Sequence, residues 1–372
     1  MTRELYGLVI PKYGMVMTEG RISTWYVAEG TRVSKGDELV DIETEKVANT
    51  YESPYSGILR RRLVEEGEAL PIGALFGIIA SDDVPDAEID AYVAEVRAAV
   101  VTATESGAGG LAPQLVDIAG GCARFLKRGD EGVPIVMIHG FAGDLSSWLL
   151  NQDVLAESHI VYALDLPGHG GSRTGEQVTS IREFADFILA FLDAMNLTKA
   201  HLIGHSLGGG AVARMAIDHP SRVASLTLLA PVGLGKEIDS EFINGLLRAD
   251  RRKDMMLVLG RLFHDRGLVS RDMVMNMLKS KRIDGAVDCL RAIAERNFKD
   301  GLQTISLRDE LSRLPLPVQI IWGASDKIIP SEHSAHLAPS VSVHLIENAG
   351  HMVHMEKAAQ VNNLTRQLIN AS

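Results

Sequence analysis

The sequence predicts two folded parts, a small all-β domain followed by a larger doubly wound α/β domain. Residues 5–80 contain short strand-like segments that are broken by Gly and Pro and show little helical periodicity. From about residue 114, apolar runs of strand length alternate with helical stretches, which is typical of a parallel sheet covered by helices. Charged, helical sequence interrupts this alternation at 233–312, which predicts an inserted cap.

Composition and charge exclude several classes of function. The 372 residues are 46% hydrophobic and 23% charged, which is typical of a soluble globular protein. A net charge of −11 argues against nucleic acid or a membrane as partner. With Cys122 and Cys289 as its only cysteines, the chain has neither a disulfide framework nor a zinc-type cluster. The N-terminus lacks a signal peptide, and no apolar run could cross a membrane, so we expect a cytoplasmic protein.

An internal repeat with an offset of 37 residues runs through the first part of the chain. The segment Trp25–Gly30 corresponds to Arg62–Gly67, and the same offset pairs Ile42 with Ile79. Glycines at matching positions indicate matching turns. The repeat predicts a small sandwich of two similar β-halves over residues 1–80.

Lys46 stands between the two halves, in the tripeptide Glu45-Lys46-Val47. A single lysine in an acidic stretch is ordinarily a solvated surface residue. Here residues 5–80 resemble a lipoyl domain of the 2-oxo-acid dehydrogenase type, with Lys46 at a hairpin tip, Glu29-Gly30 before it and Ser56-Gly57 after it. The resemblance implies that lipoic acid is attached to Lys46. The related biotinyl domains favour Met on both sides of the lysine, unlike this chain.

Residues 81–113 have the composition of a linker that contains one helix. Pro85 and its acidic neighbours favour a helix start, and Ile89 and Tyr92 fall on one helical face. The segment Ser106–Gly110 is typical of a flexible tether. Two interpretations of the helix remain open: it packs on a neighbouring domain, or it is a docking site for a partner enzyme.

The second domain, residues 114–372, is organised around Ser206. The apolar pair Leu202-Ile203 runs directly into a Gly-x-Ser-x-Gly motif, Gly204–Gly208, and a helix start follows. Such a turn between strand and helix lifts the serine hydroxyl clear of the sheet, although a purely structural turn would show the same pentapeptide. Buried strands are predicted at 135–138, 160–164, 200–203, 225–229, 318–322 and 341–346, and helices at 181–195 and 208–218.

Asp326 and His351 each follow a predicted strand of the same sheet. Each residue alone fits an ordinary loop or surface position, but the order Ser, Asp, His is that of the α/β-hydrolases. We therefore predict Ser206 as nucleophile, His351 as general base and Asp326 as the carboxylate that orients the imidazole. The backbone N–H groups of Phe141 and Leu207 are predicted to form the oxyanion hole.

Other polar residues receive structural interpretations. We interpret Asp165 and His169 as parts of a structural turn, and His354 and Glu356 as packing and helix-start residues. The spacing of the histidines does not match a metal-ligand set, so no metal site is predicted.

The cap predicted at 233–312 would set substrate access and exclude water from the site. Its methionines favour core packing over a ligand surface. The basic run Arg251-Arg252-Lys253 is interpreted as a solvated face, with contacts to the phosphates of coenzyme A as the alternative.

The whole chain resembles the E2 component, a dihydrolipoamide acetyltransferase, of bacterial acetoin dehydrogenase complexes. This resemblance implies an acetyl group carried on lipoyl-Lys46 and transferred to coenzyme A. It also implies a thiamine-diphosphate E1, a flavoprotein E3 and a homo-oligomer. The His-x-x-x-Asp-Gly motif of ordinary E2 proteins is absent, so Ser206 would have to perform the acyl chemistry.

Two other functions remain open from the sequence. The same triad would hydrolyse an ester, a thioester or a C–C bond if water reached the acyl-enzyme. Alternatively, the second domain would only help to assemble a complex around the lipoyl carrier, and the intact triad argues against that.

Overall fold

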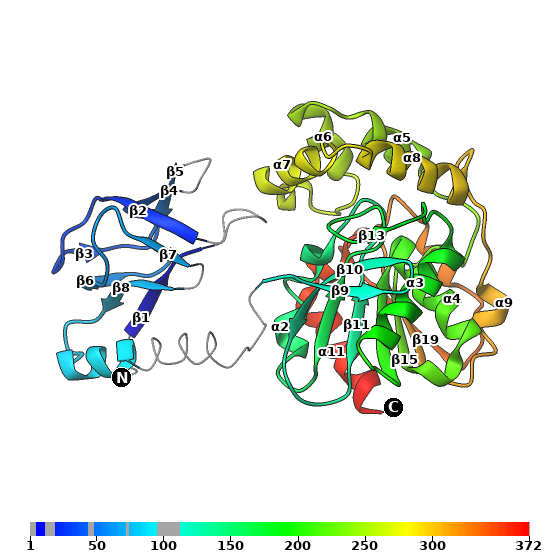
Figure 1. Ribbon diagram of the computed structural model, residues 1–372, viewed down its shortest axis with the longest axis horizontal. Helices are drawn as coiled ribbons and strands as arrows, with labels where there is room; N and C mark the ends of the chain where they lie inside the picture. Colours follow the sequence, from blue (N-terminus) through cyan, green and yellow to red (C-terminus); the bar gives the residue numbers. More distant parts are fainter. Residues whose placement is uncertain (1–4, 12–18, 44–47, 72–73, 95–111, 372) are drawn as a thin grey trace. The chain divides into compact units, whose positions relative to one another are not determined.

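A computed structural model describes residues 5–11, 19–43, 48–71, 74–94 and 112–371 of the protein. The chain divides into two compact units, Met1–Ala108 and Gly109–Ser372 (Figure 1).

The described strands of the first unit form two four-stranded antiparallel sheets, with strand orders β1-β8-β6-β3 and β5-β4-β2-β7. The strands are β1 (Leu5–Val9), β2 (Glu19–Trp25), β3 (Arg32–Val33), β4 (Glu38–Glu43), β5 (Ala48–Glu52), β6 (Gly57–Arg62), β7 (Ala69–Pro71) and β8 (Leu75–Ala80). Buried apolar side chains such as Leu8, Ile22, Leu59 and Phe76 form its core.

The 37-residue repeat corresponds to a symmetry of this sandwich. The same offset carries β2 onto β6, β3 onto β7 and β4 onto β8, and so relates one sheet to the other. Gly30 and Gly67 occupy matching turns, with φ of 84° and 94°, a region that side chains disfavour. The prediction of two similar β-halves is therefore confirmed.

A helix over residues 86–94 packs on the first unit. Ile89 is fully buried in a cluster that includes Leu75 and Ile78 of β8. The Asp86 carboxylate accepts a hydrogen bond of 2.8 Å from Arg60 of β6. Of the two interpretations of this helix, the structure supports packing on a neighbour, because its apolar face is covered by its own unit. The predicted tether lies outside the described residues.

The second unit is built on one sheet with strand order β13-β10-β12-β11-β14-β15-β18-β19, and β9 pairs with β10 at its side. Neighbouring strands from β12 to β19 in this order are parallel, as predicted. The strands are β9 (Gln114–Ile118), β10 (Gly121–Arg128), β11 (Ile135–Ile138), β12 (Val161–Leu164), β13 (Arg173–Thr174), β14 (Ala200–His205), β15 (Val223–Leu229), β18 (Val318–Gly323) and β19 (Val341–Ile346).

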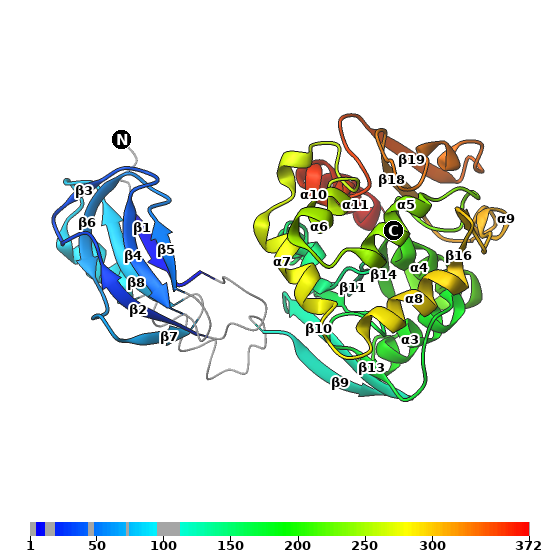
Figure 2. The ribbon, with the colours of Figure 1, turned by 90° about the horizontal axis from the view of Figure 1, so that it is seen from above.

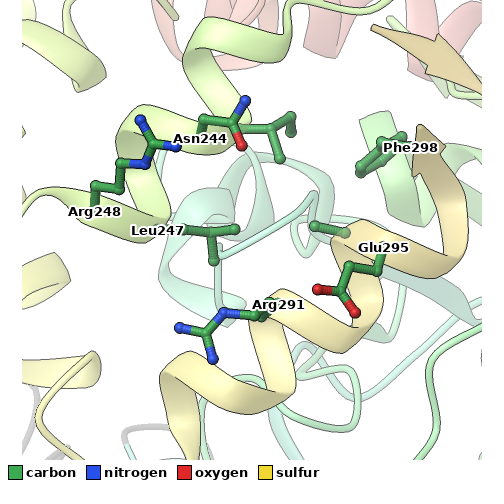
Figure 3. A pocket seen from close by; sticks show the side chains of 8 residues that line it. Asn244, Leu247, Arg248, Arg291, Glu295 and Phe298 are labelled. Carbon is green, nitrogen blue, oxygen red and sulfur yellow. The ribbon is translucent and has the colours of Figure 1, made fainter. Parts of the chain in front are cut away.

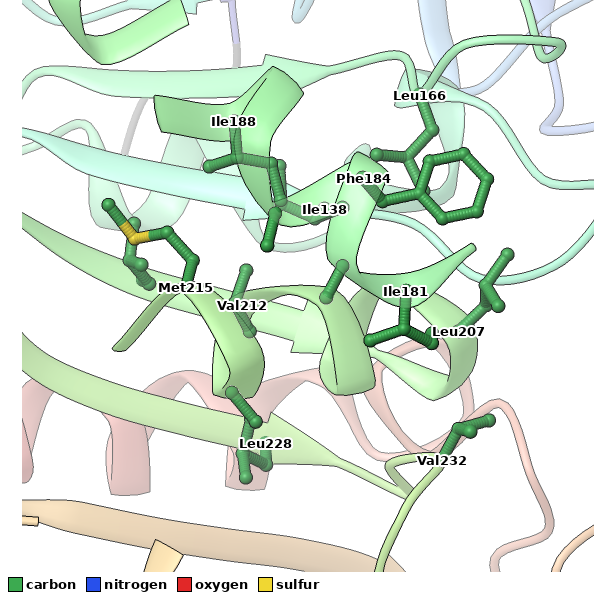
Figure 4. Packing of buried hydrophobic residues seen from close by; sticks show 14 of the residues in the cluster. Ile138, Leu166, Ile181, Phe184, Ile188, Leu207, Val212, Met215, Leu228 and Val232 are labelled. Carbon is green, nitrogen blue, oxygen red and sulfur yellow. The ribbon is translucent and has the colours of Figure 1, made fainter. Parts of the chain in front are cut away.

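Helices cover both faces of this sheet, which gives two separate cores. Alternate residues of β11 show the division, since Val136 and Ile138 face one core whereas Ile135 and Met137 face the other. Figure 4 shows the first core, where α3 and α4 pack on the sheet. The helices on the two faces are α2 (Gln152–Leu155), α3 (Ile181–Ala194), α4 (Ser206–Asp218), α10 (Val353–Glu356) and α11 (Ala358–Asn370).

The start of α3 follows from local sequence. The Ser180 side chain accepts from the Glu183 N–H, and Glu183 Oε2 accepts from the Ser180 N–H at 2.9 Å, which completes a capping box.

The sheet differs from the sequence prediction at both edges. The antiparallel strands β9 and β10 are not predicted, because their charged residues hide the apolar pattern. Strand β19 is predicted as buried, but Val343 and Leu345 are exposed, because β19 ends the sheet and has a neighbour on one side only.

The segment 233–312 forms a helical cap with a small core of its own, in which Met255 is fully buried beside Leu259 and Leu278 (Figures 1 and 2). The helices and short strands of this range are α5 (Ser240–Arg248), α6 (Arg252–Leu259), α7 (Arg271–Ser280), α8 (Ala286–Asn297), β16 (Phe298–Lys299), β17 (Leu302–Gln303) and α9 (Arg308–Leu311). The last of them, α9, contacts α4, and its Leu311 belongs to the core of the sheet. Within the described ranges, no helix has both the length and the apolar character that a membrane span requires.

Candidate active site

Ser206 lies at the junction of β14 and α4, in a backbone conformation that is rare for a side chain. Its φ is +53°, in the left-handed region. A Cβ at Gly204 would lie 2.5 Å from the Gly208 carbonyl oxygen, and one at Gly208 would lie 2.3 Å from the His139 carbonyl oxygen. Both glycines are therefore needed for this tight turn, which holds Ser206 at the carboxyl end of the sheet.

Asp326 and His351 are hydrogen-bonded to one another. His351 Nδ1 lies 2.7 Å from Asp326 Oδ2, and the two side chains are 3% and 0% exposed. Asp326 also accepts from Trp322 Nε1 at 2.9 Å and from the N–H groups of Ile328 and Ile329 at 2.8 and 3.1 Å. These donors fix the carboxylate, which in turn holds the Nδ1 side of the imidazole.

His205 connects the turn at Ser206 to the loop of His351. Its Nε2 lies 3.0 Å from the His351 carbonyl oxygen, and the two ring centroids are 4.7 Å apart. A carbonyl oxygen only accepts, so Nε2 of His205 must carry the proton. Burial holds the pKa of His205 well below its usual value, which keeps the ring neutral. The residue next to Ser206 thus positions the main chain of His351.

The backbone near Phe141 packs directly against Ser206. A Cβ at Gly140 would lie 3.0 Å from the Ser206 Cβ, so a side chain there would force the two segments apart. In the part of the chain that the structure describes, the N–H groups of Phe141 and Leu207 have no hydrogen-bond acceptor. The side chain of Leu207 points into the core against Ile181 (Figure 4). Two unpaired donors next to a serine fit the predicted oxyanion hole.

Asp165 joins the loops that follow β11 and β12. Its buried carboxylate accepts from Arg124 at 2.7 Å, from the Leu145 N–H at 2.7 Å and from the Gly171 N–H at 2.9 Å. These contacts fit the structural interpretation of this turn. His169, in the same turn, is buried, and this burial lowers its pKa to about 3, so its ring is neutral.

Glu356 has a role that the sequence did not indicate. Its Oε1 accepts from the Gly350 N–H at 2.6 Å, and its Oε2 accepts from the N–H groups of His264 and Asp265 at 2.9 and 3.3 Å. The Met352 N–H also donates to the carbonyl oxygen of Leu262 at 3.1 Å. The cap segment 262–265 is therefore fastened to the loop of His351. The sequence predicts only a helix start for Glu356, because the partners of its carboxylate are distant in sequence.

Comparisons with known proteins agree with the two-part fold. Residues 7–79 match the family described as biotin-requiring enzyme, and residues 133–358 match the family described as alpha/beta hydrolase fold. The dihydrolipoyllysine-residue acetyltransferase component of the acetoin cleaving system of Cupriavidus necator is 39% identical, over 97% of this chain and 96% of its own. The component of the same name from Pseudomonas putida is 41% identical, over 96% and 97%. The chain belongs to the family of acetyltransferase components of acetoin cleaving systems.

The acetoin-system acetyltransferase family thus combines a lipoyl-type domain with an α/β-hydrolase domain, as the sequence predicted, and this chain is an acyltransferase. A solved meta-cleavage product hydrolase from Pseudomonas fluorescens IP01 covers 69% of this chain and 97% of its own. Its TM-score is 0.63 at 22% identity, which shows the shared fold of the second unit alone.

Lys46, the predicted attachment residue of this acetyltransferase, lies outside the described residues. The strands before and after it, β4 and β5, pair with one another, with Glu43 opposite Ala48. Asp41 of β4 accepts from Thr50 of β5 at 2.7 Å and from Tyr26 at 2.6 Å. A braced pair of strands suits a lysine that carries a lipoyl group, because the group must stand clear of the sandwich. Within the described ranges, no group of three or more His, Cys, Asp or Glu could hold a metal ion.

Proposed function

We propose that Ser206, His351 and Asp326 carry out the acyl transfer of this family, from a lipoyl-borne thioester to coenzyme A. The contact of 2.7 Å between His351 Nδ1 and Asp326 Oδ2 gives the most direct support. With Nδ1–H donated to the carboxylate, the neutral ring keeps its lone pair on Nε2, where a general base needs it.

In the first half of the reaction, Ser206 Oγ attacks the carbonyl carbon of the acetyl thioester while His351 Nε2 takes the hydroxyl proton. Asp326 stabilises the resulting imidazolium. The N–H groups of Phe141 and Leu207 stabilise the oxyanion of the tetrahedral intermediate. When this intermediate collapses, the C–S bond breaks and His351 returns the proton to the departing thiolate, leaving an acetyl ester on Ser206.

The second half repeats these steps with coenzyme A. His351 Nε2 takes the proton of the thiol, and the thiolate attacks the acetyl ester. The C–O bond to Ser206 then breaks, the proton returns to Oγ, and acetyl-coenzyme A leaves. Water must be kept away from the ester throughout, and the cap over the site fits this need.

The lipoyl group supplies, when attached to Lys46, the mobile thiol that delivers the acetyl group. Both close relatives are named as components of an acetoin cleaving system, which supports a thiamine-diphosphate E1 and a flavoprotein E3 as partners. We also propose a cytoplasmic location, where the free thiols of Cys122 and Cys289 stay reduced. A homo-oligomer is proposed as well and is checked by light scattering.

The experiment mixes protein acetylated on its lipoyl arm with coenzyme A and quantifies acetyl-coenzyme A and free acetate. Wild type should form acetyl-coenzyme A, and Ser206→Ala should reduce the rate by about 10⁴-fold or more. Ser312→Ala serves as a matched control, because its hydroxyl donates only to the Arg308 carbonyl oxygen in α9.

Two other outcomes would contradict the proposal. Free acetate as the main product, with or without coenzyme A, would make the second unit a tethered hydrolase. Undiminished formation of acetyl-coenzyme A by Ser206→Ala would leave the α/β-hydrolase unit with a role in assembly only.

A further inference from the structure

A cavity of about 320 Å³ lies in the cap between α5 and α8 (Figure 3). Its size is within the range of sites for small molecules. The lining residues are Ile243, Asn244, Leu247, Arg248, Arg291, Ala294, Glu295 and Phe298.

The two ends of this cavity differ in chemistry. Figure 3 shows Arg248 of α5 and Arg291 of α8 at one end, Leu247 between, and Phe298 at the other end. Arg248 forms no ion pair with any residue that the structure describes. Arg291 pairs with Asp288 at 2.6 Å, but both side chains are about half exposed or more, so this pair is weak. Both guanidinium groups are therefore available to an anion.

Phe298, which lines one end of the cavity, contacts Phe141, whose N–H is predicted to belong to the oxyanion hole. The rings of Phe298 and Phe141 meet edge to face, with centroids 6.0 Å apart. Phe141 follows Gly140, whose backbone packs against Ser206. Phe298 and Phe141 thus connect the lining of the cavity with the backbone beside Ser206.

We propose that this cavity binds coenzyme A, with its phosphates on Arg248 and Arg291 and its pantetheine stem along Leu247 toward Phe298. The inference rests on the proposed function, in which coenzyme A accepts the acetyl group from Ser206. Guanidinium groups bind phosphates in a forked geometry, and the apolar middle of the cavity suits a stem of methylene and amide groups.

The charges that line the cavity determine which end of coenzyme A lies at the arginines. The Glu295 carboxylate lines the cavity on the same helix as Arg291, four residues closer to Phe298. It repels phosphate from that end, so the anionic part of coenzyme A stays at the arginines and the thiol lies toward Ser206. Residues 233–312 contain 15 Lys and Arg against 13 Asp and Glu, whereas residues 109–232 contain 8 against 12 and residues 313–372 contain 4 against 4. The cap is thus the part of the second unit least repulsive to a polyanion.

Binding of the phosphates at Arg248 and Arg291 differs from the alternative that the sequence offers. Arg252 begins α6, is exposed and does not line the cavity, whereas the sequence offers the run Arg251-Arg252-Lys253 as an alternative contact for the phosphates. Arg252→Gln is therefore a matched control for Arg248→Gln and Arg291→Gln, because all three are exposed arginines of the cap.

The test compares coenzyme A with pantetheine, which has the same thiol and stem but no phosphate. In the full lipoylated protein, Arg248→Gln and Arg291→Gln should each raise KM for coenzyme A by about tenfold, since a charged hydrogen bond to phosphate is lost. The wild type should prefer coenzyme A to pantetheine, and this preference should be smaller in Arg248→Gln and Arg291→Gln. The control Arg252→Gln should show the same preference as the wild type. Calorimetric titration of coenzyme A into Ser206→Ala, with and without Arg248→Gln, measures the same loss without turnover.

Three results would overturn the assignment. Unchanged binding of coenzyme A in both arginine variants would exclude this cavity, and a loss confined to Arg252→Gln would place the phosphates at α6. A lower rate at saturating coenzyme A, with KM for coenzyme A unchanged, would make the arginines a docking surface for the lipoyl domain of the same chain. If wild type forms acetate but still binds coenzyme A through these arginines, the proposed transfer fails while the binding site stands.

Discussion

Asp165 and Asp326 are both buried carboxylates that follow a strand of the same sheet, yet their partners differ. The Asp165 carboxylate accepts hydrogen bonds from Arg124 and from two backbone N–H groups, and none of these donors can lose a proton near neutral pH. The Asp326 carboxylate accepts hydrogen bonds from two backbone N–H groups, from the indole N–H of Trp322 and from the imidazole of His351. Of all these partners, only the imidazole has a second ring nitrogen that can act as a general base.

This comparison shows that burial and position at a strand end do not distinguish the carboxylate that we propose as catalytic from a structural one. Both residues lie at strand ends, where the fold places ligands and catalytic groups. What distinguishes Asp326 is that its hydrogen bonds end on His351, which in turn is fastened to His205 beside Ser206. Asp165 connects only structural loops.

The sharpest test of the comparison is Asp326→Asn. An amide would donate to His351 Nδ1, place the proton on Nε2 and so block the general base. We expect kcat to fall by about 10³–10⁴-fold, with the circular dichroism spectrum unchanged. A drop of less than about tenfold would show that another group orients His351.

Asp165→Asn should have the opposite profile. It leaves the Arg124 guanidinium without its charge partner, so the free energy of unfolding should fall by about 3 kcal/mol in a urea titration. The kcat of the folded fraction should remain close to that of wild type. A large loss of kcat without a loss of stability would give Asp165 a catalytic role and remove the contrast.

Glu356→Gln tests a third carboxylate, which joins the cap to the loop of His351. Gln keeps one acceptor oxygen of the two that bind Gly350, His264 and Asp265. We expect kcat/KM to fall by about tenfold, because the loop and the cap lose a charged hydrogen bond. The exposed neighbour Glu347 provides the control Glu347→Gln. Equal kinetics for both variants would make Glu356 a helix-start residue after all.

The smallest effect concerns a buried histidine that must stay neutral. Burial and the nearby His351 lower the pKa of His354 to about 3, whereas the unfolded chain takes up the proton near 6.5. Between these values the unfolded state binds more protons, so stability falls as the pH decreases, by up to about 1.4 kcal/mol per pH unit.

His354→Phe should reduce this dependence between pH 7 and 5, measured as the slope of Tm against pH. His336→Asn is the control, because His336 is exposed and asparagine tolerates its φ of 57°. An unchanged slope in His354→Phe would mean that other groups account for the acid sensitivity.

The sequence was sufficient wherever a local pattern determines three-dimensional position. Ser206, Asp326 and His351 each follow a predicted strand, and the carboxyl ends of parallel strands share one edge of a sheet. The 37-residue repeat was sufficient for the same reason, because it carries three strands of one half, β2, β3 and β4, onto three strands of the other.

The remaining features depend on neighbours that are distant in sequence. Glu356 joins the cap more than 90 positions before it. The cavity needs α5 and α8 side by side, although some 40 residues separate them. The exposure of β19 depends on the order of strands in the sheet and not on its own apolar sequence. The pairing of β9 with β10 likewise cannot be inferred from alternation that charged residues interrupt.

The left-handed backbone conformation at Ser206 implies that thermal stability and activity make opposite demands on this position. Holding a side chain in this region costs on the order of 1–3 kcal/mol, whereas glycine adopts it freely. Replacing Ser206 with glycine should therefore give an inert protein that melts at a higher temperature than the active one. Selection for thermal stability alone would favour loss of the hydroxyl group, so only selection for activity keeps a serine in this turn.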